Sequence, residues 1–94
     1  MDLEWDEVKR QDALNERGLD FADVERFDPD SLDTFEDLRF NYREPRYITF
    51  GYLDDRLAMY CWTWRGHRMR IISMRKANDR ELKSYKIRQA SRHT

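Results

Sequence analysis

The N-terminal third of the chain has the pattern of two helices. Asp6 is a good N-cap for a helix over residues 7–17, and Gly18 is a good stop signal. Asp20 predicts the cap of a second, shorter helix, which Pro29 would end. The second helix would place three apolar residues on one face, namely Phe21, Val24 and Phe27.

Four later segments have the alternating pattern of β-strands. A weak edge strand is expected over residues 31–37, and a better strand over residues 46–52. The strongest strand spans residues 56–65, and another spans residues 68–75. Gly66-His67 joins these last two as a two-residue link with glycine first, which predicts a type II′ hairpin.

The last segment carries a helix start signal, because Asn78 is followed by Glu81 at capping-box spacing. The predicted order α-α-β-β-β-β-α indicates an α+β domain, with helices packed on one face of an antiparallel sheet. Strict alternation in the last strand places Met69, Ile71 and Ser73 on one face and Arg68, Arg70 and Ile72 on the other. The face without helices would stay open, lined by Trp62, Trp64, Arg68 and Arg70.

Length and charge change this picture in one respect. The 94 residues predict a single domain over residues 1–94 with one modest core. No apolar run approaches a membrane span, so we expect a cytoplasmic protein without a membrane partner.

The net charge of −1 hides an imbalance, since residues 1–37 carry −10 and residues 38–94 carry +9. This imbalance predicts a surface for a polyanion; the alternative is that the two halves neutralise each other within the fold.

The residues capable of chemistry exclude several enzyme classes. The three glycines are scattered, so they form no phosphate-binding loop, and one cysteine with two histidines gives no metal-ligand spacing. We therefore expect no metal and no cofactor. What remains is cations interleaved with aromatic residues, which suits single-stranded nucleic acid because cations neutralise phosphates and aromatic faces stack on bases. The alternative is an ordinary solvated sheet edge, with the tryptophans in the core.

The same residue types could also cut RNA without a metal. Attack by a ribose 2′-hydroxyl on the adjacent phosphate needs a base, an acid and fixed positive charge, and leaves a 2′,3′-cyclic phosphate. Glu44 is the candidate base and Lys9 or Tyr85 the candidate acid, although these could equally be surface salt-bridge partners. We expect Arg65 and Arg70 to hold the transition-state charge. Further RNA contacts are expected from Arg46, Arg68, Arg75, Lys76 and Trp64.

Three blocks of the chain resemble the BrnT toxins of bacterial type II toxin–antitoxin systems. In LEWDEVKRQDALNERGLDFADV, the matching residues are Trp5, Asp6, Lys9, Asn15, Gly18, Phe21 and Ala22. In REPRYITFGYLDDRLAMYCWTWR, they are Glu44, Arg46, Gly51, Arg56, Leu57, Thr63 and Arg65. In RIISMRKANDRELKSY, they are Arg70, Ile71, Ile72, Ser73, Arg75, Ala77, Glu81 and Tyr85. Arg17 stands where the family usually has a histidine.

The resemblance implies a RelE-like fold and a ribonuclease activity that inhibits translation. It also implies neutralisation by a BrnA-type antitoxin with a ribbon-helix-helix domain, in a 2:2 complex that binds operator DNA through the antitoxin. Two other classes stay open. One is a non-catalytic subunit that binds nucleic acid or acts only as corepressor of a DNA-binding partner. The other is an inert adaptor that uses its charge asymmetry only for protein docking.

Overall fold

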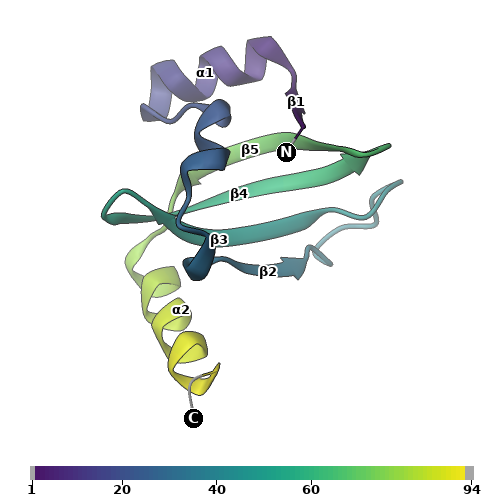
Figure 1. The fold of residues 1–94 in the computed structure, drawn as a ribbon. Helices are drawn as coiled ribbons and strands as arrows, with labels where there is room; N and C mark the ends of the chain where they lie inside the picture. Colours follow the sequence, from purple (N-terminus) through teal and green to yellow (C-terminus); the bar gives the residue numbers. More distant parts are fainter. Residues whose placement is uncertain (1, 93–94) are drawn as a thin grey trace.

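The structure, a computed structural model, describes residues 2–92 of the expected domain. A five-stranded sheet forms its centre, with the strand order β1-β5-β4-β3-β2 (Figure 1). The strands are β1 (Leu3–Trp5), β2 (Asp33–Glu36), β3 (Tyr47–Leu53), β4 (Arg56–Arg65) and β5 (Arg68–Lys76). The helices are α1 (Glu7–Arg17), the 3₁₀ helices η1 (Phe21–Arg26) and η2 (Pro29–Ser31), and α2 (Asp79–Arg92). None of these helices is both long and apolar enough to cross a membrane.

The predicted α+β class is confirmed, and the arrangement is compatible with a RelE-like fold. Strands β2 to β5 pair antiparallel in chain order. At the β4–β5 turn, Gly66 has φ of 61° and His67 has no positive φ, as a type II′ turn requires. The sheet is nevertheless mixed, because β1 pairs in parallel with the other edge of β5. β1 was not predicted, since three residues are too few to show an alternating pattern.

Local sequence sets both ends of α1 and the start of α2. The Asp6 carboxylate caps α1 by accepting a hydrogen bond from the Val8 N–H at 2.9 Å. Gly18 ends α1 with φ of 69°, a left-handed conformation that glycine adopts without steric cost. Asn78 and Glu81 form the predicted capping box, in which each side chain accepts a hydrogen bond from the other's backbone N–H, at 2.8 and 2.9 Å.

Between α1 and β2 the chain forms two 3₁₀ helices instead of the predicted short α-helix. η1 follows the predicted cap Asp20, whereas Pro29 starts η2 rather than only ending a helix. The apolar residues at three-residue spacing are all buried, namely Phe21, Val24 and Phe27. A 3₁₀ helix has 3.0 residues per turn, so this spacing keeps them on one face better than an α-helix would.

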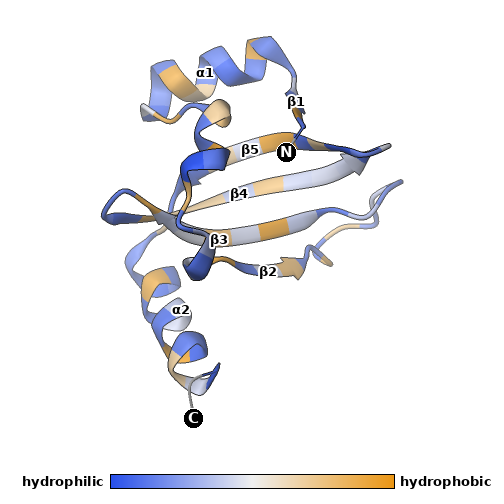
Figure 2. Cartoon of the chain, in the orientation of Figure 1, coloured by the Kyte–Doolittle hydropathy of each residue, from blue (hydrophilic) through white to orange (hydrophobic). Residues whose placement is uncertain are grey.

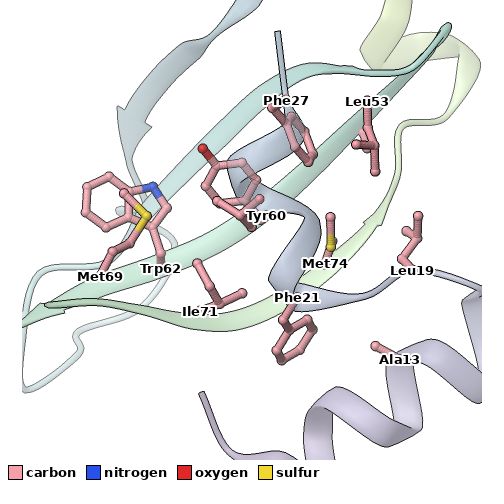
Figure 3. Close-up of a cluster of buried hydrophobic side chains, with 12 residues drawn as sticks. Ala13, Leu19, Phe21, Phe27, Leu53, Tyr60, Trp62, Met69, Ile71 and Met74 are labelled. Carbon is pink, nitrogen blue, oxygen red and sulfur yellow. The ribbon is translucent and has the colours of Figure 1, made fainter. Parts of the chain in front are cut away.

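Helices cover both faces of the sheet, which corrects the expectation that they pack on one face only. On one side, which we call the α1 face, α1 and η1 enclose a core that includes Phe21, Tyr60 and Ile71 (Figure 3). On the other side, the α2 face, Tyr85 of α2 packs against residues of β3 and β4 such as Phe50. Both α-helices carry many hydrophilic residues, whereas apolar residues mark the central strands (Figure 2). A central strand with apolar residues on both sides needs cover on both sides.

A β-bulge interrupts β5 at its middle. Cys61 pairs with Ser73, and its neighbour Trp62 pairs with Ile71, so Ile72 is an extra residue opposite β4. A bulge of this kind shifts the later residues of the strand by one position relative to the partner strand. The strict alternation predicted for this strand is therefore wrong beyond Ile71.

The bulge brings two arginines to the same face. Arg70 pairs with Thr63 and Arg75 pairs with Met59, and these two β4 positions are four residues apart and point to the same side. Met74 accordingly lies in the core of the α1 face, with 0% exposure. An uninterrupted strand would place Arg70 and Arg75 on opposite faces, because they are five residues apart. With the bulge, both lie on the α2 face.

Candidate nucleic-acid interface

A cleft of about 300 Å³ lies on the α2 face, between the sheet and α2. The sheet lines it with apolar side chains, namely Phe35, Ile48, Phe50 and Met59. Four arginines also line it, namely Arg39, Arg75, Arg80 and Arg88. We call this feature the α2 cleft. Its combination of an apolar sheet surface with several cations is the type of site that accepts a partly apolar anion.

The Asp37 carboxylate organises the loop between β2 and β3. Its side chain is 1% exposed, and it accepts hydrogen bonds from Arg39 Nε at 2.8 Å, Arg39 Nη2 at 2.9 Å and the Tyr42 hydroxyl at 3.0 Å. The bond from the Arg39 guanidinium is the main reason why the pKa of Asp37 lies well below its ordinary value. The Arg39 side chain stays 64% exposed. Asp37 therefore holds an exposed cation in a defined position at the α2 cleft.

Arg46, one of the predicted RNA contacts, belongs to the same loop network. Its carbonyl accepts a hydrogen bond from the Asp37 N–H at 2.7 Å, and its guanidinium carbon lies 4.3 Å from the centroid of the Tyr42 ring. Its Nε is buried and has no hydrogen-bond partner within residues 2–92. Arg46 thus helps to shape the loop and retains one unsatisfied donor.

The free end of the β4–β5 hairpin brings together several residues predicted to act on RNA. Arg65 Nη2 donates to Glu44 Oε1 at 3.0 Å, and both side chains stay partly exposed. Arg68 is the cross-strand partner of Arg65. Arg70 lies two residues further along β5, where its Nη1 is 3.7 Å from Glu4 Oε2. We call Glu44, Arg65, Arg68 and Arg70 the hairpin cluster.

Arg75 and Lys76 lie at the opposite end of β5. Arg75 makes a two-point ion pair with Glu81, at 2.8 and 2.9 Å, which raises the pKa of the guanidinium and lowers the pKa of the carboxyl. Because Glu81 also caps α2, this pair fixes the start of the helix against β5. Lys76 is exposed and pairs in register with Ala58. Arg75 thus has a structural partner and also lines the α2 cleft.

Three predicted site residues neither belong to the hairpin cluster nor line the α2 cleft. Lys9 is exposed on α1, on the opposite face of the sheet. Tyr85 is 4% exposed, its hydroxyl donates to the Ser31 carbonyl at 2.5 Å, and burial raises its pKa. Trp64 is 48% exposed and meets the buried Trp62 edge to face on the α1 face, with centroids 5.1 Å apart. The predicted open face is therefore not formed, because the two tryptophans and the arginines of β5 point to opposite sides.

Some of the charge asymmetry is neutralised inside the fold. The Asp33 carboxylate, 6% exposed, accepts from Arg88 Nε at 2.6 Å and from Arg92 Nη2 at 3.1 Å, which ties α2 to β2. The Arg88 guanidinium also lies 5.8 Å from the centroid of the Phe35 ring. Arg80, by contrast, makes no ion pair within the described range and is exposed. The asymmetry thus serves both internal pairing and an exposed positive surface.

Most of the residues that line the α2 cleft were not predicted from the sequence as site residues. Arg39, Arg80, Arg88 and Phe35 were not predicted as site residues, and Asp37 was treated only as the end of a strand. One usable signal was present: three arginines and two aromatic residues are interleaved over residues 39–46, as cations and aromatic residues are in the β4–β5 segment. The four cleft residues come from three separate segments, so only the fold brings them together.

Two groups of cations therefore share the α2 face, the hairpin cluster at one end and the α2 cleft at the other. Within residues 2–92, no three His, Cys, Asp or Glu side chains are grouped to hold a metal ion. A cationic face beside apolar and aromatic side chains defines a small α+β protein suited to nucleic acid.

Over residues 5–81, the chain matches the family described as ribonuclease toxin, BrnT, of type II toxin–antitoxin systems. The chain belongs to this family, which confirms the resemblance found in its sequence. It is accordingly a ribonuclease toxin whose family implies an antitoxin partner. A comparison with curated proteins gives no match.

Proposed function

We propose that this toxin is a metal-independent endoribonuclease that cuts single-stranded RNA in the cytoplasm and thereby inhibits translation. The observation that carries the proposal is the hairpin cluster, in which Glu44 lies 3.0 Å from Arg65 and Arg65 pairs across the strands with Arg68. A carboxylate among guanidiniums supplies both a base and fixed positive charge. The cluster lies on the exposed end of a hairpin, where an RNA strand can approach it.

In the proposed mechanism, Glu44 takes the proton of a ribose 2′-hydroxyl, and the 2′-oxygen attacks the adjacent phosphorus. The bond between phosphorus and the 5′-oxygen then breaks, and water protonates the leaving oxygen. Arg65 and Arg70 stabilise the charge of the phosphorane, because guanidiniums stay protonated and match the geometry of phosphate oxygens. Lys9 and Tyr85 have no part in this step, since one lies on the opposite face and the other is buried.

The chemistry is tested by cleavage of a defined single-stranded RNA in excess chelator. We expect cleavage to persist, with products that carry a 5′-hydroxyl and a 2′,3′-cyclic phosphate. A substrate with a 2′-deoxyribose at the cut position should be resistant, because it lacks the nucleophile. Loss of cleavage in chelator, with recovery on adding magnesium, would contradict the mechanism.

Arg70→Gln tests the assignment of the site. The change should lower the cleavage rate on the order of a hundredfold, as the loss of one transition-state charge stabiliser does. Arg26→Gln is the matched control, because Arg26 is a 55% exposed arginine of η1 that pairs with Asp23 and Asp54, away from the hairpin cluster. Equal activity of both variants and the wild type would place the active surface elsewhere.

We further propose that a BrnA-type antitoxin with a ribbon-helix-helix domain covers this toxin in a 2:2 complex that represses its own operon. Exposed apolar side chains on the β2–β3 loop and on α2 support a protein partner, since Leu38 is 79%, Phe40 67% and Ile87 61% exposed. The complex is tested by co-expression with the ribbon-helix-helix protein encoded beside the toxin, if one is present. Native mass and binding of operator DNA by the purified pair give the readout.

A further inference from the structure

The α2 cleft and the hairpin cluster are two separate cationic groups joined by one strand. Arg70 and Arg75 pair with Thr63 and Met59, which are four residues apart on β4, so the two arginines lie about 14 Å apart along the sheet at about 3.4 Å per residue. A stacked strand advances about 3.4 Å per nucleotide, so this distance corresponds to at most about four nucleotides. The bulge at Ile72 keeps both ends on the α2 face. An RNA strand held at the hairpin cluster can therefore continue along the sheet to the cleft.

Two cations of the cleft are available to an incoming phosphate. Arg80 makes no ion pair within the described range and is exposed. Arg39 uses Nε and Nη2 to bind Asp37, and its Nη1 makes no hydrogen bond to the described residues. The guanidinium of Arg39 is thus held at one side and open at the other. Pre-positioned donors of this kind bind a phosphate without a large loss of side-chain entropy.

An aromatic side chain lies beside these cations. Phe35 is 42% exposed and stacks on Phe50, with centroids 6.0 Å apart and an interplanar angle of 23°. The ring is partly exposed, and the Arg88 guanidinium lies 5.8 Å from its centroid. Aromatic faces next to arginines are the usual platform for an unpaired nucleobase, whatever its sequence. An acidic peptide would use the cations but would have no planar group for the ring.

We propose that the α2 cleft is an RNA subsite that binds one nucleotide a few positions from the cut bond. Phe35 stacks on the base, and Arg39 and Arg80 bind its phosphate. This inference rests on the proposed cleavage at the hairpin cluster. Asp37 is the positioning residue, because it orients Arg39 without reaching the ligand. The subsite adds contacts to single-stranded RNA beyond the reacting phosphate.

Binding is measured separately from cleavage with a fluorescent hexanucleotide in which every ribose is 2′-O-methylated, so that the 2′-hydroxyl nucleophile is absent. Fluorescence anisotropy of the full chain gives the affinity at several salt concentrations. We expect Phe35→Leu to weaken binding about tenfold, through loss of base stacking. Arg80→Gln should weaken it severalfold and reduce the slope of log affinity against log salt by about 0.7, the value for one phosphate contact on a single strand. Arg26→Gln, the same chemical change on η1, should leave affinity and slope unchanged.

Three other results would support or overturn the subsite and the cleavage proposal separately. Wild-type affinity and salt slope in both cleft variants would overturn the subsite. Displacement of the RNA by a decaglutamate peptide at similar concentration, with equal sensitivity to both variants, would overturn it in favour of an acidic protein segment. If the two substitutions weaken RNA binding but the wild-type protein does not cut unmodified RNA, the subsite is supported and only the cleavage proposal is overturned. Arg80 is exposed and makes no ion pair within the described range, so its variant tests the subsite even if Phe35→Leu does not fold.

Discussion

Asp37→Asn is expected to loosen the β2–β3 loop and to destabilise the whole protein. The Asp37 carboxylate is 1% exposed and receives side-chain hydrogen bonds from Arg39 and Tyr42 at 2.8 to 3.0 Å. Asparagine has almost the same shape but no charge, and its amide nitrogen is a donor where an acceptor is needed. The variant therefore removes the electrostatic part of the network with little change in packing.

The magnitude follows from the number and kind of bonds lost. A hydrogen bond to a charged group contributes about 1.5 to 3 kcal/mol. The amide oxygen of asparagine can keep one of the Arg39 bonds, and the exposed Arg39 regains hydration when the other is broken. We therefore expect a net loss of about 2 to 3 kcal/mol in the free energy of unfolding. This loss is large against the total of about 5 to 15 kcal/mol typical of a domain.

The pH dependence gives an independent test. The pKa of Asp37 is lowered in the folded state, so its stabilisation is fully present above the unfolded pKa, about 3.9, and is lost as the pH falls through the folded pKa. The difference in stability between wild type and Asp37→Asn should therefore be constant from pH 7 down to about pH 5. It should shrink as the pH is lowered below about 3.9.

Urea unfolding followed by tryptophan fluorescence measures this difference at each pH. Asp12→Asn is the matched control, because Asp12 is exposed on α1, and it should stay within about 0.5 kcal/mol of wild type. A wild-type urea midpoint for Asp37→Asn at pH 7 would refute the structural role of the carboxylate. A loss that stays equally large at pH 2.5 would show that packing, not charge, is responsible.

Three further changes test other parts of the structure. Arg17→His removes the hydrogen bond from Arg17 to the Met74 carbonyl, 3.0 Å long, and should lower stability by about 1 kcal/mol in urea while the fold is retained. Gly51→Ala places a methyl group 2.8 Å from Leu32 Cδ2 and should cost about 1 to 3 kcal/mol; an unchanged urea midpoint would show that Leu32 moves aside freely. Tyr85→Phe should cost about 1 to 2 kcal/mol of stability but leave the RNA cleavage rate unchanged, whereas a hundredfold slower rate would make this hydroxyl catalytic.

Local signals in the sequence were sufficient for most elements of the fold. The caps at Asp6 and Asn78 act through side chains and backbone groups within three residues, so their spacing predicts α1 and the start of α2. Gly66 likewise predicts its turn because only the local φ matters. β1 could not be predicted in this way, because its pairing with β5 joins residues 3–5 to residues 69–71. The side on which α2 packs also depends on such distant contacts.

The candidate site was predictable only where its residues are neighbours on one hairpin. Arg65, Arg68 and Arg70 were found because alternating cations and aromatic residues are visible along the β4–β5 segment. The partnership of Glu44 with Arg65 was not derivable, since the two residues are 21 positions apart and meet only when the loop folds back on β4. Periodicity also misplaced the tryptophans, because it shows which residues share a face but not which face receives the helix.

The bulge at Ile72 places both cationic groups of the candidate site on the same face of the sheet. If β5 paired regularly through Ile72, the side chain of Arg75 would point to the α1 face, where Met74 now lies with 0% exposure among apolar residues. An unpaired guanidinium there would cost several kcal/mol, so a regular β5 could not keep both Arg70 and Arg75 in the chain. With the bulge, the core of the α1 face stays apolar and both cations lie on the α2 face. Bulges often redirect side chains beside active sites, and here the redirection joins the hairpin cluster to the α2 cleft.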